Sequence, residues 1–395
     1  MRCLHNRCGC LAQWQKWISR MGSFADASKA IRCCDATDGT ELRTMAEIPM
    51  KDSRTLIAEL QDEIEKVIGP HLVGVENFAL VDFPNHSNVG DSAIWLGEET
   101  YLQKKLGRAP SYVCTYDTWS KKEFERAVPV GPILIHGGGN FGDLWPSHQE
   151  FRLRLLSEFP DRPIIQLPQT IHFSSKASLK RAAEIINSHK KFRILVRDVQ
   201  SLNIATAEFT APVDLCPDMA FCLGAQSSPA AVTKKLLLLL RTDHEKVEQK
   251  HFPPLPNFAV VEDWLNEQRG LGKWLFVKAL LETALLLLKG RTSSELDVRI
   301  RWFHLLASNR VARGMRQVGS SAYVITDRLH THIFCVLLNL PHSVLDNNYG
   351  KISTFVDAWS KPFEKLSRPL STSVDGALAK FLDICQGSSA PTDQR

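Results

Sequence analysis

Residues 78–107, FALVDFPNHSNVGDSAIWLGEETYLQKKLG, decide the fold class. The stretch opens with a short apolar run, FALVD, that is typical of a buried strand, and it closes with a segment of helical spacing. The loop between them is polar, with Gly90 suited to a tight turn and Asp91 suited to capping the helix. A strand that leads into a helix through such a loop is the repeating unit of α/β proteins.

The alternation of strand and helix patterns continues along the chain. Apolar runs such as ILIH, PIIQL and FRILV are separated by helical patterns, and a second series runs from KKLLLLLR through AYVIT to SVL. This order indicates right-handed crossovers and parallel sheets. Because 395 residues are too many for one ordinary core, we predict an α/β protein with two Rossmann-like domains that face a cleft. The N-terminal α/β domain is expected at 53–225 and the C-terminal one at 226–386, with a poorly patterned, cysteine-rich extension at 1–52 and a disordered tail at 387–395.

The composition excludes several classes of protein. With 44% hydrophobic and 23% charged residues, the chain is typical of a globular protein. Its net charge of +5 suits anionic ligands, but no basic stripe is interleaved with aromatic residues, so we expect no nucleic-acid partner. No apolar run is long enough to span a membrane, and no secretory signal is evident before Met50, so we expect a cytoplasmic protein.

Two adjacent segments raise the question of membrane contact. The run WLFVKALLETALLLLK, from Trp274, is interrupted by Lys278 and Glu282 and is predicted to be a buried helix. Residues 289–316 then carry seven lysines and arginines against two acids. A solvated helix face is one interpretation of this basic stretch. The alternative is peripheral contact with the inner face of an anionic membrane or with a lipid-linked phosphate.

The cysteines do not match a known metal framework. Half of the ten cysteines lie in the first 34 residues, where Cys3, His5, Cys8 and Cys10 have spacings that match none of the common zinc sites. The others lie mostly in apolar contexts and are expected to be reduced core residues. The sequence therefore predicts no metal site.

Polar residues follow several of the predicted strands. In open parallel sheets the ligand binds beyond the carboxyl ends of the strands, so chemistry is expected in these loops. After FALVD the loop presents Asn85, Asn88 and Asp91. Asp91 is either a helix cap alone or a carboxylate that accepts a proton from a sugar hydroxyl, and its residue type favours neither interpretation.

A glycine-rich segment follows the strand ILIH. Glycines directly after a strand allow a ligand close to the backbone, and they free N–H groups to point at an anion. No helix opens at the last glycine, so this is not the dinucleotide-binding pattern. Contact with a phosphate, carboxylate or sugar is one interpretation, and a structural turn is the other. The segment follows His136 and consists of Gly137, Gly138, Gly139 and Gly142 around Asn140.

Two further loops add neutral hydrogen-bonding groups and a cation. Gln169 and Thr170 follow PIIQL and offer groups that bind hydroxyls, although a satisfied loop explains them nearly as well. Arg241 follows KKLLLLL, and a cation at the carboxyl end of a strand is expected to face the cleft.

The segment ITDRLHTHIF, residues 325–334, joins a strand to a helix. We expect Asp327 at the helix cap, and Arg328 and His330 in the first turn, where the helix dipole favours an anion. Arg328 offers a planar fork for a carboxylate or phosphate, and His330 can exchange a proton near neutral pH. His332 is two residues further on, so it is expected to point elsewhere and to fill space.

Between residues 54 and 385 the chain carries an ordered set of motifs: NHSNVGDSAIW, LIHGGGNFGDLW, IIQLPQTIHF, LVRD, CPDMAF, LLLRTD and VITDRLHTHIFCVLLNLPHSVLDNNYGKI. This set resembles the polysaccharide pyruvyl transferases. Seven motifs in order are much more specific than any one of them. The resemblance implies a GT-B-like glycosyltransferase architecture. It also implies an enzyme that moves the enolpyruvyl group of phosphoenolpyruvate onto hydroxyls of a sugar, as a cyclic ketal.

The resemblance further implies roles for individual residues. Arg241 and Arg328 would hold the carboxylate and phosphate of the donor, His330 would transfer a proton, and Asp91 would lie on the acceptor side. Residues 136–140 would line the cleft between them. Phosphoenolpyruvate would be the donor substrate and a sugar or lipid-linked oligosaccharide the acceptor, with no cofactor and no metal. The identity of the general acid stays open.

Two other functions are compatible with the sequence. A nucleotide-sugar-dependent GT-B glycosyltransferase would use the same scaffold, commonly with a C-terminal-domain carboxylate that holds the ribose. The loop after SVL offers only Asp346 for that role. A non-catalytic subunit that binds sugars or anions would keep the arginines but would not need His330. The presence of acid, cations and histidine together favours an enzyme.

Overall fold

The computed structural model describes residues 49–242, 253–288, 295–346 and 351–387. The residues from Lys51 onward form one compact unit. The cysteine-rich segment with its zinc-like spacings lies outside the described residues, and so do the tail after residue 387 and most of the loop that follows SVL.

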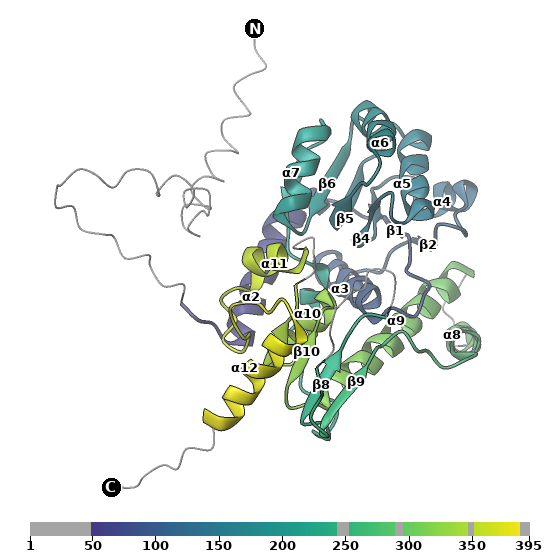
Figure 1. The fold of residues 1–395 in the computed structure, drawn as a ribbon. Helices are drawn as coiled ribbons and strands as arrows, with labels where there is room; N and C mark the ends of the chain where they lie inside the picture. Colours follow the sequence, from purple (N-terminus) through teal and green to yellow (C-terminus); the bar gives the residue numbers. More distant parts are fainter. Residues whose placement is uncertain (1–48, 243–252, 289–294, 347–350, 388–395) are drawn as a thin grey trace, which may run out of the picture. The chain divides into compact units, whose positions relative to one another are not determined.

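Seven parallel strands form the first sheet (Figure 1). Their order is β2-β1-β3-β5-β6-β7, and β4 pairs with β5 beside this path. Every pairing is parallel, as the crossover pattern of the sequence predicts. The strands are β1 (Ala79–Val81), β2 (Tyr112–Cys114), β3 (Ile133–Ile135), β4 (Gly138–Gly142), β5 (Ile164–His172), β6 (Phe192–Val196) and β7 (Val213–Leu215).

Helices connect these strands, and polar side chains cap several of them. The Asp52 carboxylate accepts a hydrogen bond from the Thr55 N–H at the start of α2 (Ser53–Ile68), and Asp198 accepts one from the Ser201 N–H at the start of α7 (Val199–Glu208). The other helices in this half are α3 (Val89–Leu106), α4 (Lys121–Ala127), α5 (Pro146–Glu158) and α6 (Lys176–Ser188), with 3₁₀ turns at Gly69–Leu72 and Met219–Leu223.

Four parallel strands form a second sheet, in the order β11-β10-β8-β9. They are β8 (Leu236–Leu239), β9 (Ala259–Glu262), β10 (Val324–Thr326) and β11 (His342–Val344). Its helices are α8 (Leu271–Leu288), α9 (Glu295–Gly319), α10 (Leu329–Leu337), α11 (Lys351–Phe355) and α12 (Val374–Gly387), with a π-helical turn at Val356–Ser360. The two sheets share no strand, since the first ends at Leu215 and the second begins at Leu236.

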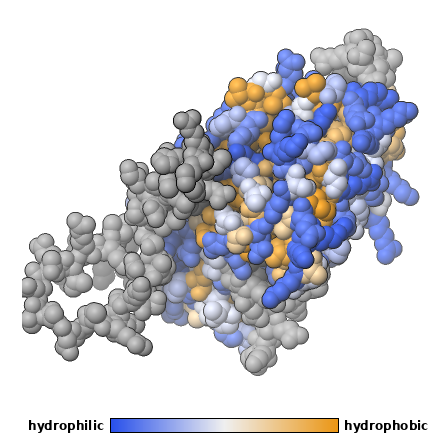
Figure 2. Space-filling view, turned by 90° about the horizontal axis from the view of Figure 1, so that it is seen from above, coloured by the Kyte–Doolittle hydropathy of each residue, from blue (hydrophilic) through white to orange (hydrophobic). Residues whose placement is uncertain are grey.

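Each sheet is buried by helices. Leu236, Leu238 and Ile325 of the second sheet pack against Leu378 and Phe381 of α12. The face of the molecule in Figure 2 is mostly hydrophilic, with hydrophobic residues in scattered groups, as on most globular proteins. No helix among the described residues combines the length and the hydrophobicity needed to cross a bilayer.

Several elements differ from the sequence prediction. β5 continues to His172, so Gln169 and Thr170 lie in a strand and not in a loop, because that part of the strand pairs with both β4 and β6. Residues 138–142 likewise form a strand. The prediction of a buried helix from Trp274 is wrong, because α8 leaves much of its apolar surface exposed. Besides β4, the sequence patterns do not predict the described elements α4, β7 and β9.

His332 is a structural residue, as its position in the sequence predicts. It is buried, with its Nδ1 atom 2.7 Å from His342 Nε2 and its Nε2 atom 2.7 Å from Ser360 Oγ. His342 Nδ1 lies 2.9 Å from the Leu340 carbonyl oxygen. Burial lowers the pKa of His332 well below the ordinary value and lowers that of His342 to about 4. Both rings are therefore neutral in the folded protein near pH 7.

This histidine pair predicts a loss of stability in mild acid. A histidine whose folded pKa is depressed stabilises the protein fully above its unfolded pKa of about 6.5, and that contribution is lost as the pH falls toward the folded pKa. We expect the unfolding temperature to fall between about pH 6.5 and pH 5, and to fall less in His342→Gln. Differential scanning fluorimetry of both proteins across this range checks it. An equal decline in both proteins would contradict it.

Candidate active site

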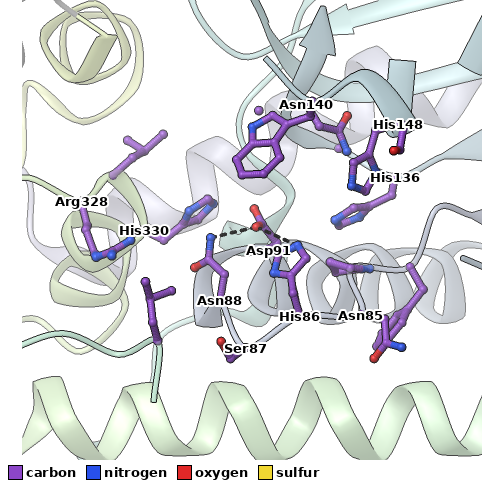
Figure 3. A pocket seen from close by; sticks show the side chains of 18 of the residues that line it. Asn85, His86, Ser87, Asn88, Asp91, His136, Asn140, His148, Arg328 and His330 are labelled. Atoms are coloured by element: carbon purple, nitrogen blue, oxygen red, sulfur yellow. Dashed lines mark hydrogen bonds and ion pairs between the residues drawn. The ribbon is translucent and has the colours of Figure 1, made fainter. Parts of the chain in front are cut away.

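A cavity of about 560 Å³ lies where the carboxyl ends of strands from both sheets converge. Its walls come from the loops after β1, β2, β3 and β6 of the first sheet and after β8, β9 and β10 of the second. Asp91 lies in the middle of Figure 3, with Arg328 and His330 on one side and His136 and His148 on the other. The structure therefore brings together residues that are far apart in the sequence.

Asp91 lies in the first turn of α3, and it is not the cap of that helix. The cap is Asn88, whose side-chain oxygen accepts a hydrogen bond of 3.1 Å from the Gly90 N–H. The Asn88 amide also donates to Asp91 Oδ2 at 2.8 Å, and His86 Nε2 lies 3.6 Å from the same oxygen. Burial alone would raise the pKa of Asp91, but His86 and His330 outweigh it and lower that pKa. Asp91 is therefore an ionised carboxylate that can accept a proton.

Gly90 allows α3 to approach His330 closely. The sequence predicts a tight turn at Gly90, but this residue lies inside α3. A Cβ atom at this position would lie 2.3 Å from His330 Nδ1. Only glycine therefore fits between the two elements without moving the histidine.

His136 follows β3 and is held by a carboxylate from α3. Its Nδ1 atom lies 2.8 Å from Oε2 of Glu98, which is fully buried, and the Gly137 N–H donates to Glu98 Oε1 at 2.8 Å. Burial alone would lower the pKa of His136, but the Glu98 carboxylate outweighs it and raises that pKa. Nε2 of this cavity-lining residue has no hydrogen-bond partner among the described residues. His136 is therefore suited to donate a hydrogen bond or a proton to a ligand.

The side chain of Asn140 is fixed by a polar network under β4. Its oxygen accepts hydrogen bonds from Arg152 Nη2 at 2.7 Å and from Gln169 Nε2 at 2.8 Å, and its amide donates to Asp82 Oδ2 at 3.3 Å. Asp82 also lies 2.8 Å from Nδ1 of the cavity residue His148. These hydrogen bonds fix the side chains of Asn140 and His148 in the cavity wall.

The glycine segment differs from the expected anion-binding loop. Its N–H groups are not all free, because those of Gly137 and Asn140 donate to Glu98 and Gln169. Gly138 has a φ of 119°, which favours glycine, and a Cβ atom there would lie 3.6 Å from Asp91 Oδ1. Gly137 and Gly139 line the cavity beside Asp91.

Arg197, Asp218 and His330 form a buried network at the boundary between the sheets. Arg197 Nη1 donates to Asp218 Oδ2 at 2.6 Å, and its Nε donates to Thr170 Oγ1 at 2.9 Å. His330 Nε2 lies 3.5 Å from Asp218 Oδ2, an ion-pair contact longer than an ordinary hydrogen bond. Burial alone would raise the pKa of Asp218, but His330 and Arg197 hold it well below its ordinary value. Asp218 is therefore ionised and lies within ion-pair distance of His330.

Two arginines from the second sheet complete the cavity wall. Arg328 Nη2 donates to Asp263 at 2.8 Å, and its guanidinium lies 5.7 Å from the centre of the Trp264 ring. Asp327 is not the helix cap that the sequence suggested. Arg328 is the residue before α10, and the Asp327 carboxylate instead accepts the Arg241 N–H at 2.9 Å. Asp327 and Asp263 thus fix the positions of the two arginines.

The expected site residues divide into two groups. The ones that line the cavity are Asn85, Asn88, Asp91, His136, Gly137, Gly139, Asn140, Arg241, Arg328 and His330. Gly138, Gln169 and Thr170 do not line the cavity. Gln169 is instead hydrogen-bonded to Asn140, and Thr170 to Arg197. No group of three or more metal-ligating side chains occurs in the ranges that the structure describes.

Comparison with known proteins identifies the family. A model of the polysaccharide pyruvyl transferase family matches residues 88–349, which include every residue of the expected site except Asn85. The chain belongs to the polysaccharide pyruvyl transferase family. Membership supports pyruvyl transfer in polysaccharide biosynthesis, and so a transferase activity.

Individual members of the family and a solved structure resemble the chain. "Putative pyruvyl transferase EpsO" of Bacillus subtilis is 32% identical over 284 residues, which cover 70% of this chain and 84% of that protein. Pyruvyl transferase 1 of Schizosaccharomyces pombe is 29% identical over 311 residues, which cover 73% and 71% of the two chains. The crystal structure of a functionally uncharacterized protein of Klebsiella pneumoniae matches 78% of this chain and 97% of its own, with a TM-score of 0.50 and 18% identity, and this supports the fold.

Several residues of the candidate site have no decisive signal in the sequence. Arg197 and Asp218 lie in the motifs LVRD and CPDMAF. Only their contacts in the folded protein, between Arg197 and Asp218 and between Asp218 and His330, indicate that they belong to the candidate site. Glu98 and Asp263 lie behind His136 and Arg328 and carry no local signal. Position at the end of a strand is the signal that points to Arg197.

Gly90→Ala is expected to lower turnover of the pyruvyl transferase by about 10²-fold, because the new Cβ displaces His330 and a misplacement near 1 Å can have this effect. The unfolding temperature should also fall, because overpacking at this contact costs about 1–3 kcal/mol and the helix propensity of alanine returns only about 1 kcal/mol. Steady-state kinetics and thermal unfolding check both. Gly376→Ala is the matched control, because Gly376 also lies in the first turn of a helix and its nearest neighbour is Ser373 Oγ at 3.5 Å. Wild-type turnover in Gly90→Ala would contradict close packing at His330.

Proposed function

We propose that the chain transfers the enolpyruvyl group of phosphoenolpyruvate onto two hydroxyls of a sugar, forms a pyruvate ketal and releases phosphate. The acceptor would be a polysaccharide unit or its lipid-linked precursor. The observation that carries the proposal is one cavity with an ionised Asp91, two polarised histidines and arginines from both halves of the chain. Membership of the polysaccharide pyruvyl transferase family supports it.

Three arginines suit a donor with a carboxylate and a phosphate. Arg197, Arg241 and Arg328 all line the cavity. Guanidinium groups bind both anions through paired hydrogen bonds, and their positions are fixed here before any ligand arrives. Arg328 donates a hydrogen bond to Asp263. Phosphoenolpyruvate would therefore bind the side of the guanidinium group that faces away from that carboxylate. Arg241 and Arg328 are the donor clamps in this proposal.

The chemistry needs an acid, a base and stabilisation of charge. In the first step an acid protonates the methylene carbon, and positive charge develops on the neighbouring carbon. A sugar hydroxyl adds to that carbon and gives its proton to a base. The carbon–oxygen bond to phosphate then breaks, and a second hydroxyl adds to close the ring. Of the two hydroxyl protons, one restores the acid and the other leaves with phosphate.

His330 and Asp91 are the acid and the base in this proposal. His330 lines the cavity with its Nε2 atom 3.5 Å from the Asp218 carboxylate, and an imidazole placed in this way is suited to proton transfer. Asp91 is ionised and lies between the histidines, which suits the base that receives the hydroxyl proton. His136 would donate a hydrogen bond through Nε2 to the donor or the acceptor. Asn85, Asn88 and Asn140 would bind sugar hydroxyls.

The proposal includes a GT-B-like arrangement. The first sheet, with its helices, would be the acceptor-side domain at 53–225, and the second would be the donor-side domain at 226–386. Support comes from the separation of the strands into two parallel sheets with the cavity at their carboxyl ends.

Ligand-dependent thermal unfolding tests the donor. Phosphoenolpyruvate at about 100 times its dissociation constant is expected to stabilise the protein by about 2.7 kcal/mol, and Arg328→Ala should abolish this effect. Arg154→Ala, on an exposed arginine outside the cavity, should retain it. A shift with nucleotide sugars and none with phosphoenolpyruvate would overturn the proposal in favour of a glycosyltransferase.

A further inference from the structure

The helix α8 exposes an apolar stripe that packs against no described part of the chain. Trp274, Val277, Leu281 and Leu285 are 61%, 51%, 62% and 56% exposed, and their spacing of three to four residues places them on one face. The opposite face is covered, since Leu275 and Ala279 are buried. Large apolar residues gathered on a surface mark a contact with a partner or a membrane. We call this stripe the α8 face.

Cations lie next to the α8 face. Arg269 is exposed just before the helix, Lys273 is exposed in its first turn, and Lys278 lies beside the stripe. The one acid in the described part of α8, Glu282, is shared between Arg301 at 3.1 Å and Lys278 at 3.9 Å. The surface around the stripe therefore carries net positive charge.

The basic stretch at 289–316 offers less surface than its composition suggests. Arg299 pairs with Glu123 at 2.9 Å, and Arg310 pairs with Glu267 at 2.7 Å. Arg313 donates to the carbonyl oxygens of Ser87 and Trp264. These α9 cations are engaged within the protein, so the described part of this stretch is a weak membrane contact, and α8 is the stronger candidate.

We propose that the α8 face docks on the surface of an anionic lipid bilayer, with the stripe among the acyl chains and the cations at the lipid phosphates. Trp274 suits the boundary between headgroups and acyl chains, and the lysine stems allow their amines to reach the phosphates. A second copy of the chain fits this surface less well. A twofold contact centred on the stripe places the same patch on itself, so Lys278, near the middle of the stripe, would lie close to Lys278 of the other copy.

The α8 face lies one helix layer from the cavity. Phe276 of α8 contacts the Trp302 ring of α9 at 5.3 Å between ring centres, and Trp302 contacts Phe303 at 5.3 Å. Phe303 stacks at 4.0 Å on Phe83, which lines the cavity. If the proposed function holds, docking would bring the cavity close to acceptor sugars carried on membrane lipids.

Vesicle sedimentation of the full chain tests the proposal, with no donor or acceptor present. The protein should bind vesicles of phosphatidylglycerol and phosphatidylethanolamine, and bind vesicles of phosphatidylcholine alone much more weakly. Trp274→Ser/Leu281→Ser should lower the partition coefficient at least about tenfold. Val73→Ser/Val130→Ser, at positions that are 78% and 79% exposed, should leave it unchanged. Arg269→Gln and Lys273→Gln should each lower it about fivefold.

Several results would overturn the proposal. Absence of binding to the anionic vesicles would do so. Equal binding by the wild type and Trp274→Ser/Leu281→Ser would show that cations elsewhere cause the binding. A dimer in light scattering that becomes a monomer in the same double variant would assign the α8 face to a second copy. None of these outcomes bears on phosphoenolpyruvate, so the proposed function stands or fails separately through the thermal-shift experiment.

Discussion

Replacing His330 by glutamine is expected to lower turnover by about 10² to 10⁴-fold and to leave the affinity for phosphoenolpyruvate nearly unchanged. The reason is that glutamine keeps a hydrogen-bonding side chain of moderate size but cannot donate a proton to carbon. Asp218, 3.5 Å from His330 Nε2, would keep its ion pair with Arg197, so the rest of the network should persist. Steady-state kinetics and donor titration together separate the two effects.

The matched control for this variant is His304→Gln. His304 lies on α9 outside the cavity, with its Nδ1 atom 2.8 Å from Glu99. Its substitution should leave turnover and donor affinity at wild-type values. If His330→Gln turns over at the wild-type rate, His330 is not the acid, and His136 becomes the stronger candidate because its Nε2 atom is unpartnered among the described residues.

Asp91→Asn is expected to lower turnover by about 10² to 10⁴-fold through loss of the base. Asparagine has the same shape and can still accept the hydrogen bond from the Asn88 amide, so the first turn of α3 should be preserved. The pKa of Asp91 is held below its ordinary value, so the carboxylate is charged at every pH from mild acid upward. The variant should therefore be impaired across that whole range.

A pH–rate profile of both proteins checks this expectation. Asp161→Asn is the control, since Asp161 is 69% exposed and lies outside the cavity. Recovery of wild-type turnover by Asp91→Asn at any pH would contradict a base at this position. A loss of donor affinity in place of turnover would instead assign Asp91 to binding.

Most elements of the fold can be predicted from local sequence patterns. Most strands and helices from α2 to α12 were predictable, because apolar periodicity and turn residues are local properties. α4 and β7 were not predicted because they are short. β5 was predicted too short because its second half depends on pairing with β4 and β6. A uniformly apolar helix such as α8 does not reveal which face is covered, so its exposure could not be predicted.

The candidate site was predictable in part. Polar residues at the ends of strands pointed to Asp91, Arg241, Arg328 and His330, all of which line one cavity. The carboxylates behind them were not predictable, because the contacts of Glu98, Asp218 and Asp263 span large distances in the sequence. Gly90 was misassigned for the same reason, since the side chain that excludes a Cβ atom belongs to a helix far along the chain.

In the proposed function, phosphoenolpyruvate is the pyruvyl donor. The most direct measurement incubates the protein with carbon-labelled phosphoenolpyruvate and a panel of hexosides and lipid-linked sugars, and follows free phosphate together with the product masses. We expect equal amounts of phosphate and of a sugar that carries labelled pyruvate as a ketal, and we expect neither product from His330→Gln or Asp91→Asn. Transfer of a hexose from a nucleotide sugar by the same protein, with no labelled product from phosphoenolpyruvate, would contradict it.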